Sequence, residues 1–391
     1  MKILLIHNYY QDWGGEDSYF ESLKELLEKN GHQVIAYTKD SKKIKNTLSK
    51  IKTGSAMFWN TNLEKELPVM IKKFQPDIAH FNNIYPLITP TAYKICKRFK
   101  IPIVQRIPNY KLVCPKGTLF RKGKICTLCI NKNFFYPSII NKCYQNSFLA
   151  SGILATSFFM HKFNKSFDYI DKFIFQNILI KNFHVKNTSI INEKTAVIPH
   201  FVGKINFLKK NVKKDYFLFV GRLSEEKGII NLLKVFSLLP KNKLVVIGDG
   251  PLRDEVASYS KYKNIIIKNF QHRNVVFEYM RNALFTIIPS SFYETGPLVL
   301  MESYANGTPV IVPRFWVFKE EVTNMKTGVF YKYNDFNDLK RKILLLSTNS
   351  KKNLIKKMSV NSKKRFEEKF TSEKHYSLLI KLYKEVLHQH I

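Results

Sequence analysis

Short apolar runs alternate with longer amphipathic segments along this chain, and the alternation occurs in two separate series. In the first series, helical spacing of apolar residues predicts helices over 16–29, 63–74 and 148–163. The strands predicted around them cover 2–7, 34–37, 77–81, 101–105, 172–175 and 195–198. Strands that alternate with helices form parallel sheets covered on both faces, so the first series predicts an α/β domain.

The second series begins after a polar, basic stretch at 203–214, which is typical of a linker. Its predicted strands cover 216–220, 244–247, 265–267, 284–288 and 309–312, and the chain beyond 335 is predicted to be helical. We therefore expect two Rossmann-like, doubly wound domains that face a central cleft, with ligands at the carboxyl ends of strands. The expected domains are 1–205 and 206–372, and a C-terminal helix at 373–391 packs back toward the first.

Two carboxylates, Glu294 and Glu302, bracket an apolar run in the stretch 290–311. Pro297 suits the first turn of a helix, whose free N–H groups would form a phosphate site. Carboxylates on either side of that phosphate could accept hydrogen bonds from hydroxyl groups. A molecule with central phosphates and hydroxyls at both ends is a sugar nucleotide. The alternative is a helix-capping Glu294 and a solvated Glu302.

Two cations, Arg222 and Lys227, follow the strand predicted at 216–220. Cations at a strand–helix junction can neutralise a diphosphate leaving group. Ordinary surface pairing with the neighbouring Glu225 and Glu226 is the alternative. Glycines in the same loop and in two further strand-end loops allow the backbone to approach a ligand closely: Gly221, Gly250, Gly14 and Gly15.

In this order and spacing, the motifs resemble the retaining glycosyltransferases of the GT-B fold, group 1, also called family 4. The resemblance rests on "GG" at 14–15, "GRLSEEKG" at 221–228, "IGDGP" at 247–251, the Glu-x7-Glu of 294–302 and "NGTPVI" at 306–311. It covers nearly the whole chain. "NYKLVCP" at 109–115, followed by a Cys-x-x-Cys, resembles a bacterial subgroup that builds capsule, O-antigen and related surface polysaccharides.

The resemblance implies a catalytic set of Arg222 and Lys227, which would bind the donor diphosphate, and Glu294, which would contact the donor sugar. Glu302 would hold the ribose hydroxyls. The remaining donor-binding residues would bring backbone close to the ligand: Gly14, Gly15, Gly221, Gly250, Gly296, Pro297 and Leu298. The first domain would bind mainly acceptor and the second the donor, and transfer would need no metal cofactor.

The chain departs from the family pattern at Pro108, where a His usually precedes the Asn-Tyr pair. His7 and His80 are candidate substitutes, although a histidine at a strand end is more often structural. His200 stands where the family commonly has Asn. These departures put one catalytic role in doubt, so a catalytically degenerate relative is an alternative to the active enzyme.

Four of the five cysteines fall in a turn-rich insert at 106–143 that interrupts the first series. They are Cys114, Cys126, Cys129 and Cys143. Four cysteines with one close pair suit a structural zinc site, because a reducing compartment disfavours disulfides. The alternative is a set of small buried thiols in a family-specific loop.

The net charge of +34 indicates a polyanionic partner or a lysine-rich soluble surface. The segment 78–167 has no Asp or Glu, holds fourteen Lys and Arg, and interleaves them with aromatic residues. This pattern favours an anionic membrane surface. No nucleic-acid recognition motif is visible. Because no signal peptide or spanning segment is apparent, we expect a cytoplasmic protein, peripheral on the inner membrane face.

Together these features predict a hexosyltransferase-type enzyme that moves a sugar from a UDP- or GDP-sugar to a hydroxyl acceptor with retention. A growing, lipid-linked surface glycan is the expected acceptor, in capsule, O-antigen or other lipopolysaccharide synthesis. Besides a degenerate relative, a nucleotide-sugar epimerase on a related fold is the alternative; it would act on the donor without any acceptor.

Overall fold

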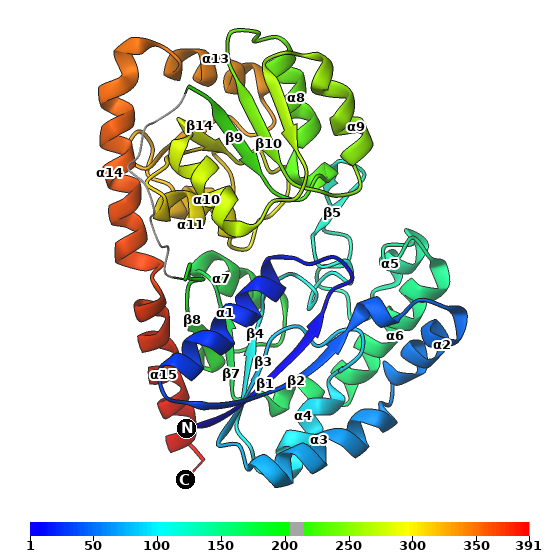
Figure 1. Ribbon diagram of the computed structural model, residues 1–391. Coiled ribbons are helices and arrows are strands. Elements are labelled where there is room, and N and C mark those ends of the chain that lie inside the picture. The colour runs from blue at the N-terminus through cyan, green and yellow to red at the C-terminus, as the bar shows by residue number, and fades with distance from the viewer. Residues whose placement is uncertain (204–214, 391) are drawn as a thin grey trace. The chain divides into compact units, whose positions relative to one another are not determined.

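The computed structural model describes residues 1–203 and 215–390, which divide into two compact units (Figure 1). The first unit comprises residues 1–119, 127–200 and 373–390, and the second comprises 120–126 together with the described part of 201–372. The C-terminal helix is thus part of the first unit. All but the first residue of the expected linker at 203–214 lie outside the described residues, as does the expected boundary at 205.

The first unit is built on six parallel strands in the order β2-β1-β3-β4-β7-β8. Apolar residues fill the central strands; Ile3, Leu4, Leu5 and Ile6 are all fully buried. The predicted strands of the first series are confirmed with small shifts at their ends: β1 (Lys2–Tyr9), β2 (Gln33–Asp40), β3 (Ile78–Phe81), β4 (Ile103–Arg106), β7 (Lys172–Phe175) and β8 (Thr195–Val197).

Helices lie on both sides of this sheet in Figure 1. In α1, for example, Phe20, Leu23 and Leu27 form a buried stripe at helical spacing. The helices of the unit are α1 (Gly15–Lys29), α2 (Thr47–Ala56), α3 (Thr61–Phe74), α4 (Thr91–Arg98), α5 (Tyr136–Ile140), α6 (Phe148–Phe163), α7 (Ile178–Asn187) and α15 (Ser372–His388). The helices α2, α4, α5 and α7 were not predicted.

The second unit repeats the plan, with six parallel strands in the order β11-β10-β9-β12-β13-β14. Its strands are β9 (Phe217–Val220), β10 (Leu244–Ile247), β11 (Ile265–Lys268), β12 (Phe285–Ile287), β13 (Val310–Pro313) and β14 (Gly328–Tyr331). Its helices are α8 (Ile229–Ser237), α9 (Arg253–Ala257), α10 (Arg273–Asn282), α11 (Leu298–Ala305), α12 (Phe318–Glu321), α13 (Phe336–Leu346) and α14 (Lys352–Lys369). Both predicted Rossmann-like sheets are therefore confirmed, and β14 is an addition that sequence patterning missed.

Each sheet has one position at which the strand order reverses. In the first unit β1 and β3 are neighbours, and in the second β9 and β12 are neighbours. In open parallel sheets a crevice forms outside the carboxyl ends of such strands, because the connections leave in opposite directions. The loops that follow these four strands are therefore the places to look for a ligand site.

The insert at 106–143 contains little regular structure apart from a two-stranded hairpin and α5. The hairpin is formed by β5 (Phe120–Arg121) and β6 (Lys124–Ile125), and it belongs to the second unit. Across residues 1–203 and 215–390, no helix combines the length and the apolar character that crossing a membrane requires.

Candidate active site

The loop after β9 lies directly against the strand end of β12. Gly228 ends the loop in a left-handed conformation, with φ of +71°, and a Cβ atom there would lie 2.2 Å from the carbonyl oxygen of Pro289. The Ser291 amide donates to the Glu226 carbonyl at 2.9 Å. Only glycine fits this close approach, so the motif at 221–228 holds the loop after β9 against the segment that follows β12.

The loop after β10 is joined to the same segment. The Leu223 amide donates to the Asp249 carbonyl at 2.8 Å, and the Leu252 amide donates to the Leu223 carbonyl at 2.9 Å. A Cβ atom on Gly250 would lie 2.6 Å from the Leu223 carbonyl oxygen. The close backbone contacts of Gly228 and Gly250 are therefore contacts between these loops. As a result, the loops after β9, β10 and β12 form one connected edge.

Lys227 and Glu294 meet at this edge. Lys227 Nζ lies 2.8 Å from Glu294 Oε1, and the Lys227 ammonium stands 5.0 Å from the centre of the Phe292 ring. Ser290 Oγ donates to the same carboxylate oxygen at 2.7 Å. The Glu294 side chain is only 7% exposed, so this ion pair is largely screened from solvent. Lys227 does not pair with Glu225 or Glu226 among the described contacts.

Glu302 lies on α11, whose first turn begins after Pro297 as the sequence predicted. Its carboxylate faces Arg273, with 3.3 Å between Arg273 Nε and Glu302 Oε1. Burial raises the pKa of Glu302, while the Arg273 charge and hydrogen bond lower it. Glu302 is therefore not a freely solvated residue, in contrast to the alternative interpretation of the sequence.

Arg273 and Ser290 were missed by sequence reasoning. Ser290 stands four residues before Glu294, and its position directly after β12 was a usable signal. Arg273 comes from the start of α10, far from any motif, and nothing in the sequence marks it as a partner of Glu302. Arg222, also predicted for this edge, has an exposed side chain in the loop after β9.

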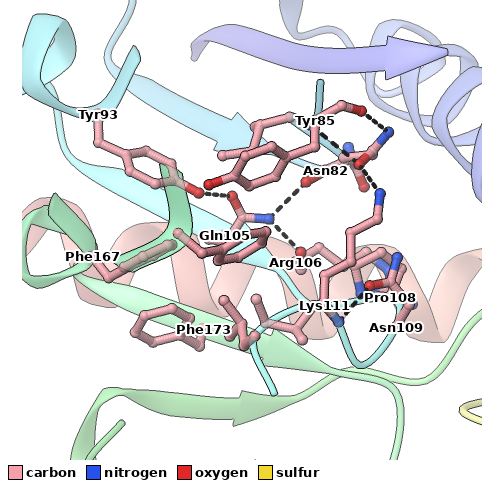
Figure 2. A pocket seen from close by; sticks show the side chains of 15 residues that line it. Asn82, Tyr85, Tyr93, Gln105, Arg106, Pro108, Asn109, Lys111, Phe167 and Phe173 are labelled. Atoms are coloured by element: carbon pink, nitrogen blue, oxygen red, sulfur yellow. Dashed lines mark hydrogen bonds between the residues drawn. The ribbon is translucent and has the colours of Figure 1, made fainter. Parts of the chain in front are cut away.

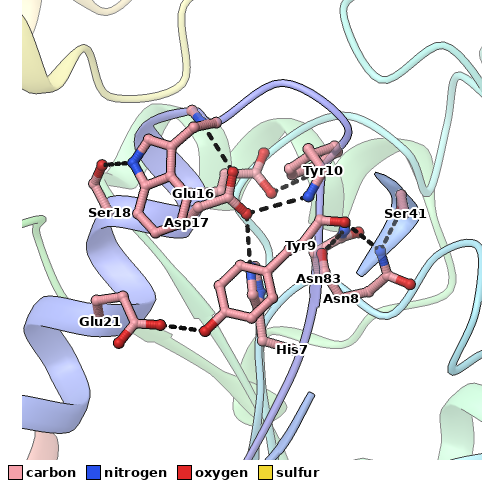
Figure 3. A network of polar contacts seen from close by, with 12 residues as sticks. His7, Asn8, Tyr9, Tyr10, Glu16, Asp17, Ser18, Glu21, Ser41 and Asn83 are labelled. Carbon is pink, nitrogen blue, oxygen red and sulfur yellow. Dashed lines mark hydrogen bonds and ion pairs between the residues drawn. The ribbon is translucent and has the colours of Figure 1, made fainter. Parts of the chain in front are cut away.

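In the first unit, Gly14 and Gly15 lie at the start of α1, in the loop that follows β1. Gly14 is the N-cap residue of α1 and has no side chain that could cap the helix. Its backbone amide donates to Asp17 Oδ2 at 2.9 Å (Figure 3). Asp17 also contacts His7, with 2.9 Å between His7 Nε2 and Asp17 Oδ1, and both side chains are fully buried. His7 is thus a structural partner of the α1 N-terminus rather than a substitute for the missing histidine.

A second polar group at this edge contains Glu16, Tyr10 and Asn109. The Tyr10 hydroxyl donates to Glu16 Oε2 at 2.7 Å (Figure 3). Asn109 Nδ2 donates to the other oxygen, Glu16 Oε1, at 2.9 Å. Lys111 Nζ donates to Asn83 Oδ1 at 3.0 Å. Burial lowers the pKa of Lys111, whereas the charges of Glu16 and Asp17 raise it.

Pro108 lines a small cavity of about 40 Å³ at the end of β4 (Figure 2). Its wall combines the aromatic rings of Tyr85 and Tyr93 with the amide groups of Asn82 and Gln105. Gln105 Nε2 donates to the Asn82 carbonyl at 2.7 Å. Asn82 Nδ2 is buried and has no hydrogen-bond partner among the described residues. The cavity therefore offers a donor group, Asn82 Nδ2, that a ligand could satisfy.

The other two histidines considered from the sequence lie in the interior of the first unit. His80 Nδ1 is 2.7 Å from the Tyr383 hydroxyl, and His200 Nδ1 is 3.0 Å from Arg106 Nη2. All four side chains are buried. Burial, followed by the Arg106 charge, lowers the pKa of His80 to about 3. His80 therefore does not replace the missing imidazole.

The predicted zinc site is not assembled. Across residues 1–203 and 215–390, which include all four cysteines, no three His, Cys, Asp or Glu side chains are grouped so that they could hold a metal ion. Burial raises the pKa of the Cys114 thiol, although backbone amides of residues 116–119 act against this shift. Cys114 and Cys129 are buried, as the alternative of packed thiols expects, whereas Cys126 and Cys143 are partly exposed.

The loops after β9, β10 and β12 lie within a region that matches a known protein family. Residues 204–365 match the family model described as glycosyl transferases group 1. An uncharacterised glycosyltransferase of Methanocaldococcus jannaschii is 27% identical over 99% of both chains. The O-antigen chain mannosyltransferase RfbU of Salmonella typhimurium is 24% identical over 57% of this chain and 61% of its own length.

Among solved structures, the sucrose-phosphate synthase of Thermosynechococcus elongatus superposes with a TM-score of 0.71. It covers 99% of both chains at 15% identity, and this similarity concerns the fold alone. With two parallel-sheet, Rossmann-like units, the GT-B architecture expected from the sequence is confirmed.

Proposed function

We propose that this glycosyltransferase, which carries a glycosyl transferases group 1 domain, moves a hexosyl residue from a UDP- or GDP-sugar to a hydroxyl acceptor with retention of configuration. The observation that carries the proposal is the ion pair of Lys227 and Glu294 at the carboxyl edge of β9 and β12. It places one cation and one carboxylate, both predicted from the motifs, at the position where the strand order reverses.

The ion pair supports a division of roles between the two residues. In the free protein Lys227 neutralises Glu294. A donor diphosphate would compete for the Lys227 ammonium, together with Arg222, and would stabilise the charge that develops on the leaving group. Glu294 would then be released to accept a hydrogen bond from a hydroxyl of the donor sugar, while Ser290 keeps its carboxylate in place.

The N-terminus of α11 supplies the other interactions that we assign to the donor. The positive end of the helix dipole lies at the free N–H groups of Gly296 and Leu298, which flank Pro297, and it favours a phosphate. Glu302 lies on the same helix and would accept hydrogen bonds from the ribose hydroxyls. Two cations and a helix end would replace a metal ion at the diphosphate, so we propose transfer without a metal cofactor.

We assign the acceptor to the first unit. The cavity beside Pro108 offers the unpartnered amide donor of Asn82, and the polar group of Asn83, Asn109 and Lys111 lies beside it. Such groups suit the hydroxyls of a carbohydrate. Similarity to an O-antigen chain mannosyltransferase supports a lipid-linked surface glycan as acceptor, in capsule, O-antigen or other polysaccharide synthesis.

A membrane-associated acceptor fits the surface of the first unit. Exposed apolar side chains occur on two helices that pack together, α2 and α6, and include Leu48 (70% exposed), Leu149 (72%) and Phe163 (77%). The acid-free segment 78–167 adds lysines to the same unit. We propose that this unit docks on the anionic, cytoplasmic face of the inner membrane, where basic residues and apolar side chains act together.

A panel of UDP, GDP, ADP and their sugars tests the donor assignment by thermal shift. A ligand at one hundred times its dissociation constant stabilises the folded protein by about 2.7 kcal/mol, which raises the melting temperature measurably. No stabilisation by any member of the panel would contradict the proposal. Release of free sugar or a transferred product distinguishes an active enzyme from the degenerate relative that Pro108 suggests, and a converted donor sugar would indicate an epimerase.

A further inference from the structure

A second cavity in the first unit has no part in the reaction proposed above. Its volume is about 320 Å³, and its walls come from the insert, from α6 and β7, and from the segment that follows α7. The floor is apolar and buried, with Phe135 (7% exposed), Phe158 (5%) and Phe173 (3%). This cavity is much larger than the one beside Pro108, although the two share four wall residues: Leu112, Phe158, Phe167 and Phe173.

The rim of this cavity is strongly basic. Lys132 from the insert, Lys162 from α6 and Lys186 from α7 all line it, and all three are exposed. No carboxylate is among the lining residues. Lys162 donates to Asn133 Oδ1 at 3.2 Å, and Lys132 stands 6.0 Å from the centre of the Tyr136 ring. Within the described parts of the chain, no carboxylate forms an ion pair with any of these lysines.

The combination of floor and rim defines the chemistry of the ligand. Three ammonium groups attract an anion, and neutral amide and hydroxyl groups of Asn131, Thr188 and Ser189 add hydrogen-bonding capacity. The phenyl floor excludes a small hydrated anion as the complete ligand and suits an aliphatic chain, which gains free energy by leaving water. A molecule with both parts is an anionic amphiphile.

The surroundings of the cavity point to the bilayer as the source. Phe134 precedes the floor residue Phe135 and packs edge-on against Phe159 of α6, with ring centres 5.7 Å apart. Phe159 in turn stacks on Phe163, which is 77% exposed. An exposed aromatic surface thus continues from the basic rim. Aromatic rings of this kind are favoured in the headgroup region of a membrane.

We propose that this cavity binds one anionic phospholipid drawn from the membrane, with its phosphate among Lys132, Lys162 and Lys186 and part of one acyl chain on the phenyl floor. The site goes beyond general attraction of a basic surface, because it would hold a single lipid in a shaped cavity. None of its three lysines belongs to the donor loops, so the lipid site is distinct from the proposed donor site.

The test uses dihexanoyl phosphatidylglycerol below its micelle concentration, titrated into the full-length protein by calorimetry without donor or acceptor. We expect saturable binding of about one lipid per chain. The double variant Lys132→Gln/Lys186→Gln should bind about 30-fold more weakly. The matched control Lys72→Gln/Lys73→Gln removes two exposed lysines from α3, outside the cavity, and should bind as the wild type does.

A third variant separates the cavity from surface charge. Ser189→Trp fills the cavity from an exposed rim position and keeps every lysine, so it should abolish binding while the melting temperature stays unchanged. Normal binding by Ser189→Trp, or equal weakening in the α3 control, would overturn the proposal. Equally tight binding of glycerol 3-phosphate or of dihexanoyl phosphatidylcholine would also overturn it, because the first lacks the chain and the second lacks the net charge.

Discussion

Lys227 and Glu294 form a direct ion pair, 2.8 Å between Nζ and Oε1, although 67 residues separate them in the sequence. One residue follows β9 and the other follows β12, and these strands are neighbours in the sheet. The pair is thus a consequence of strand order. A ligand that binds Lys227 must compete with Glu294 for the ammonium group, and a ligand that binds Glu294 must compete with Lys227 for the carboxylate.

Removing the cation of this pair should weaken donor binding. We expect Lys227→Met to lose roughly 1.5–3 kcal/mol of binding free energy for UDP or GDP, since a hydrogen bond to a charged group is lost. Lys234→Met on α8 removes an exposed lysine nearby and should bind normally. Calorimetric titration of both variants checks this, and unchanged affinity in Lys227→Met would remove this residue from the donor site.

Glu302 should distinguish nucleotides from bare phosphates. We expect Glu302→Gln to weaken UDP or GDP binding by roughly tenfold, equivalent to about one hydrogen bond to a charged group. Pyrophosphate, which has no ribose, should bind as tightly as it does to the wild type. Glu278→Gln on the exposed face of α10 is the control. Equal loss of both ligands would indicate that Glu302 serves only to hold Arg273.

Gly228 should tolerate no side chain. We expect Gly228→Ala to lower the free energy of unfolding by about 1–3 kcal/mol and to weaken donor binding, since the left-handed backbone and the Pro289 carbonyl both oppose a Cβ atom. Gly31→Ala is a matched control, because Gly31 has a similar φ of +79° but no atom within 4 Å of the added Cβ. Denaturant unfolding of both variants measures the difference; similar losses would show that the Pro289 contact is unimportant.

The buried histidines of the first unit should make the protein sensitive to acid. Burial and the Arg106 charge lower the pKa of His375 to about 3, as they do for His80, from an ordinary value of 6.5. The unfolded chain takes up these protons first, so the stability is fully present above pH 6.5 and is lost as the pH falls toward 3. Each group contributes a slope of about 1.4 kcal/mol per pH unit in this window.

Denaturant unfolding at pH 7 and at pH 5 measures this slope. His375→Gln should unfold more easily at pH 7 but lose less stability between the two pH values than the wild type. His272→Gln, at an exposed position before α10, should keep the wild-type slope. An unchanged slope in His375→Gln would mean that folding does not lower the pKa of this histidine.

Restoring the imidazole at Pro108 tests the role of the departure from the family pattern. We expect Pro108→His to raise the rate of transfer or of donor hydrolysis by about 10-fold or more, in the range of a positioned general acid–base or polar group, with little change in donor affinity. Steady-state rates and nucleotide titrations on the same preparations separate the two effects. A slower variant with normal donor affinity would show that proline is the functional residue here.

Much of the fold was predictable because local pattern and tertiary environment agree. The central strands are nearly continuous apolar runs, as buried parallel strands require, and α6 begins and ends where its spacing predicted. β14 was missed because Gly328 opens it and only four residues define it. The short α4, with its buried Ile95 and Cys96, offers too few turns for a clear period.

The candidate site was predictable only where its residues belong to a motif. Lys227 and Glu294 were found, but their mutual contact depends on strand order, which the sequence does not state. Arg273 reaches Glu302 through the packing of α10 against α11, a contact without a local signal. The cysteines failed as a zinc site for a related reason: spacing alone does not determine whether side chains converge.

The position of α15 reverses the order in which the two units become complete. Its Tyr383 hydroxyl contacts His80 of β3, and its His375 contacts the Pro199 carbonyl at 2.7 Å, so the interior of the first unit is closed by residues that are made after the second unit. On the ribosome, nearly all of the second unit is therefore available before the first can finish its core. Until α15 has been made, the interior face that it covers in the first unit stays open.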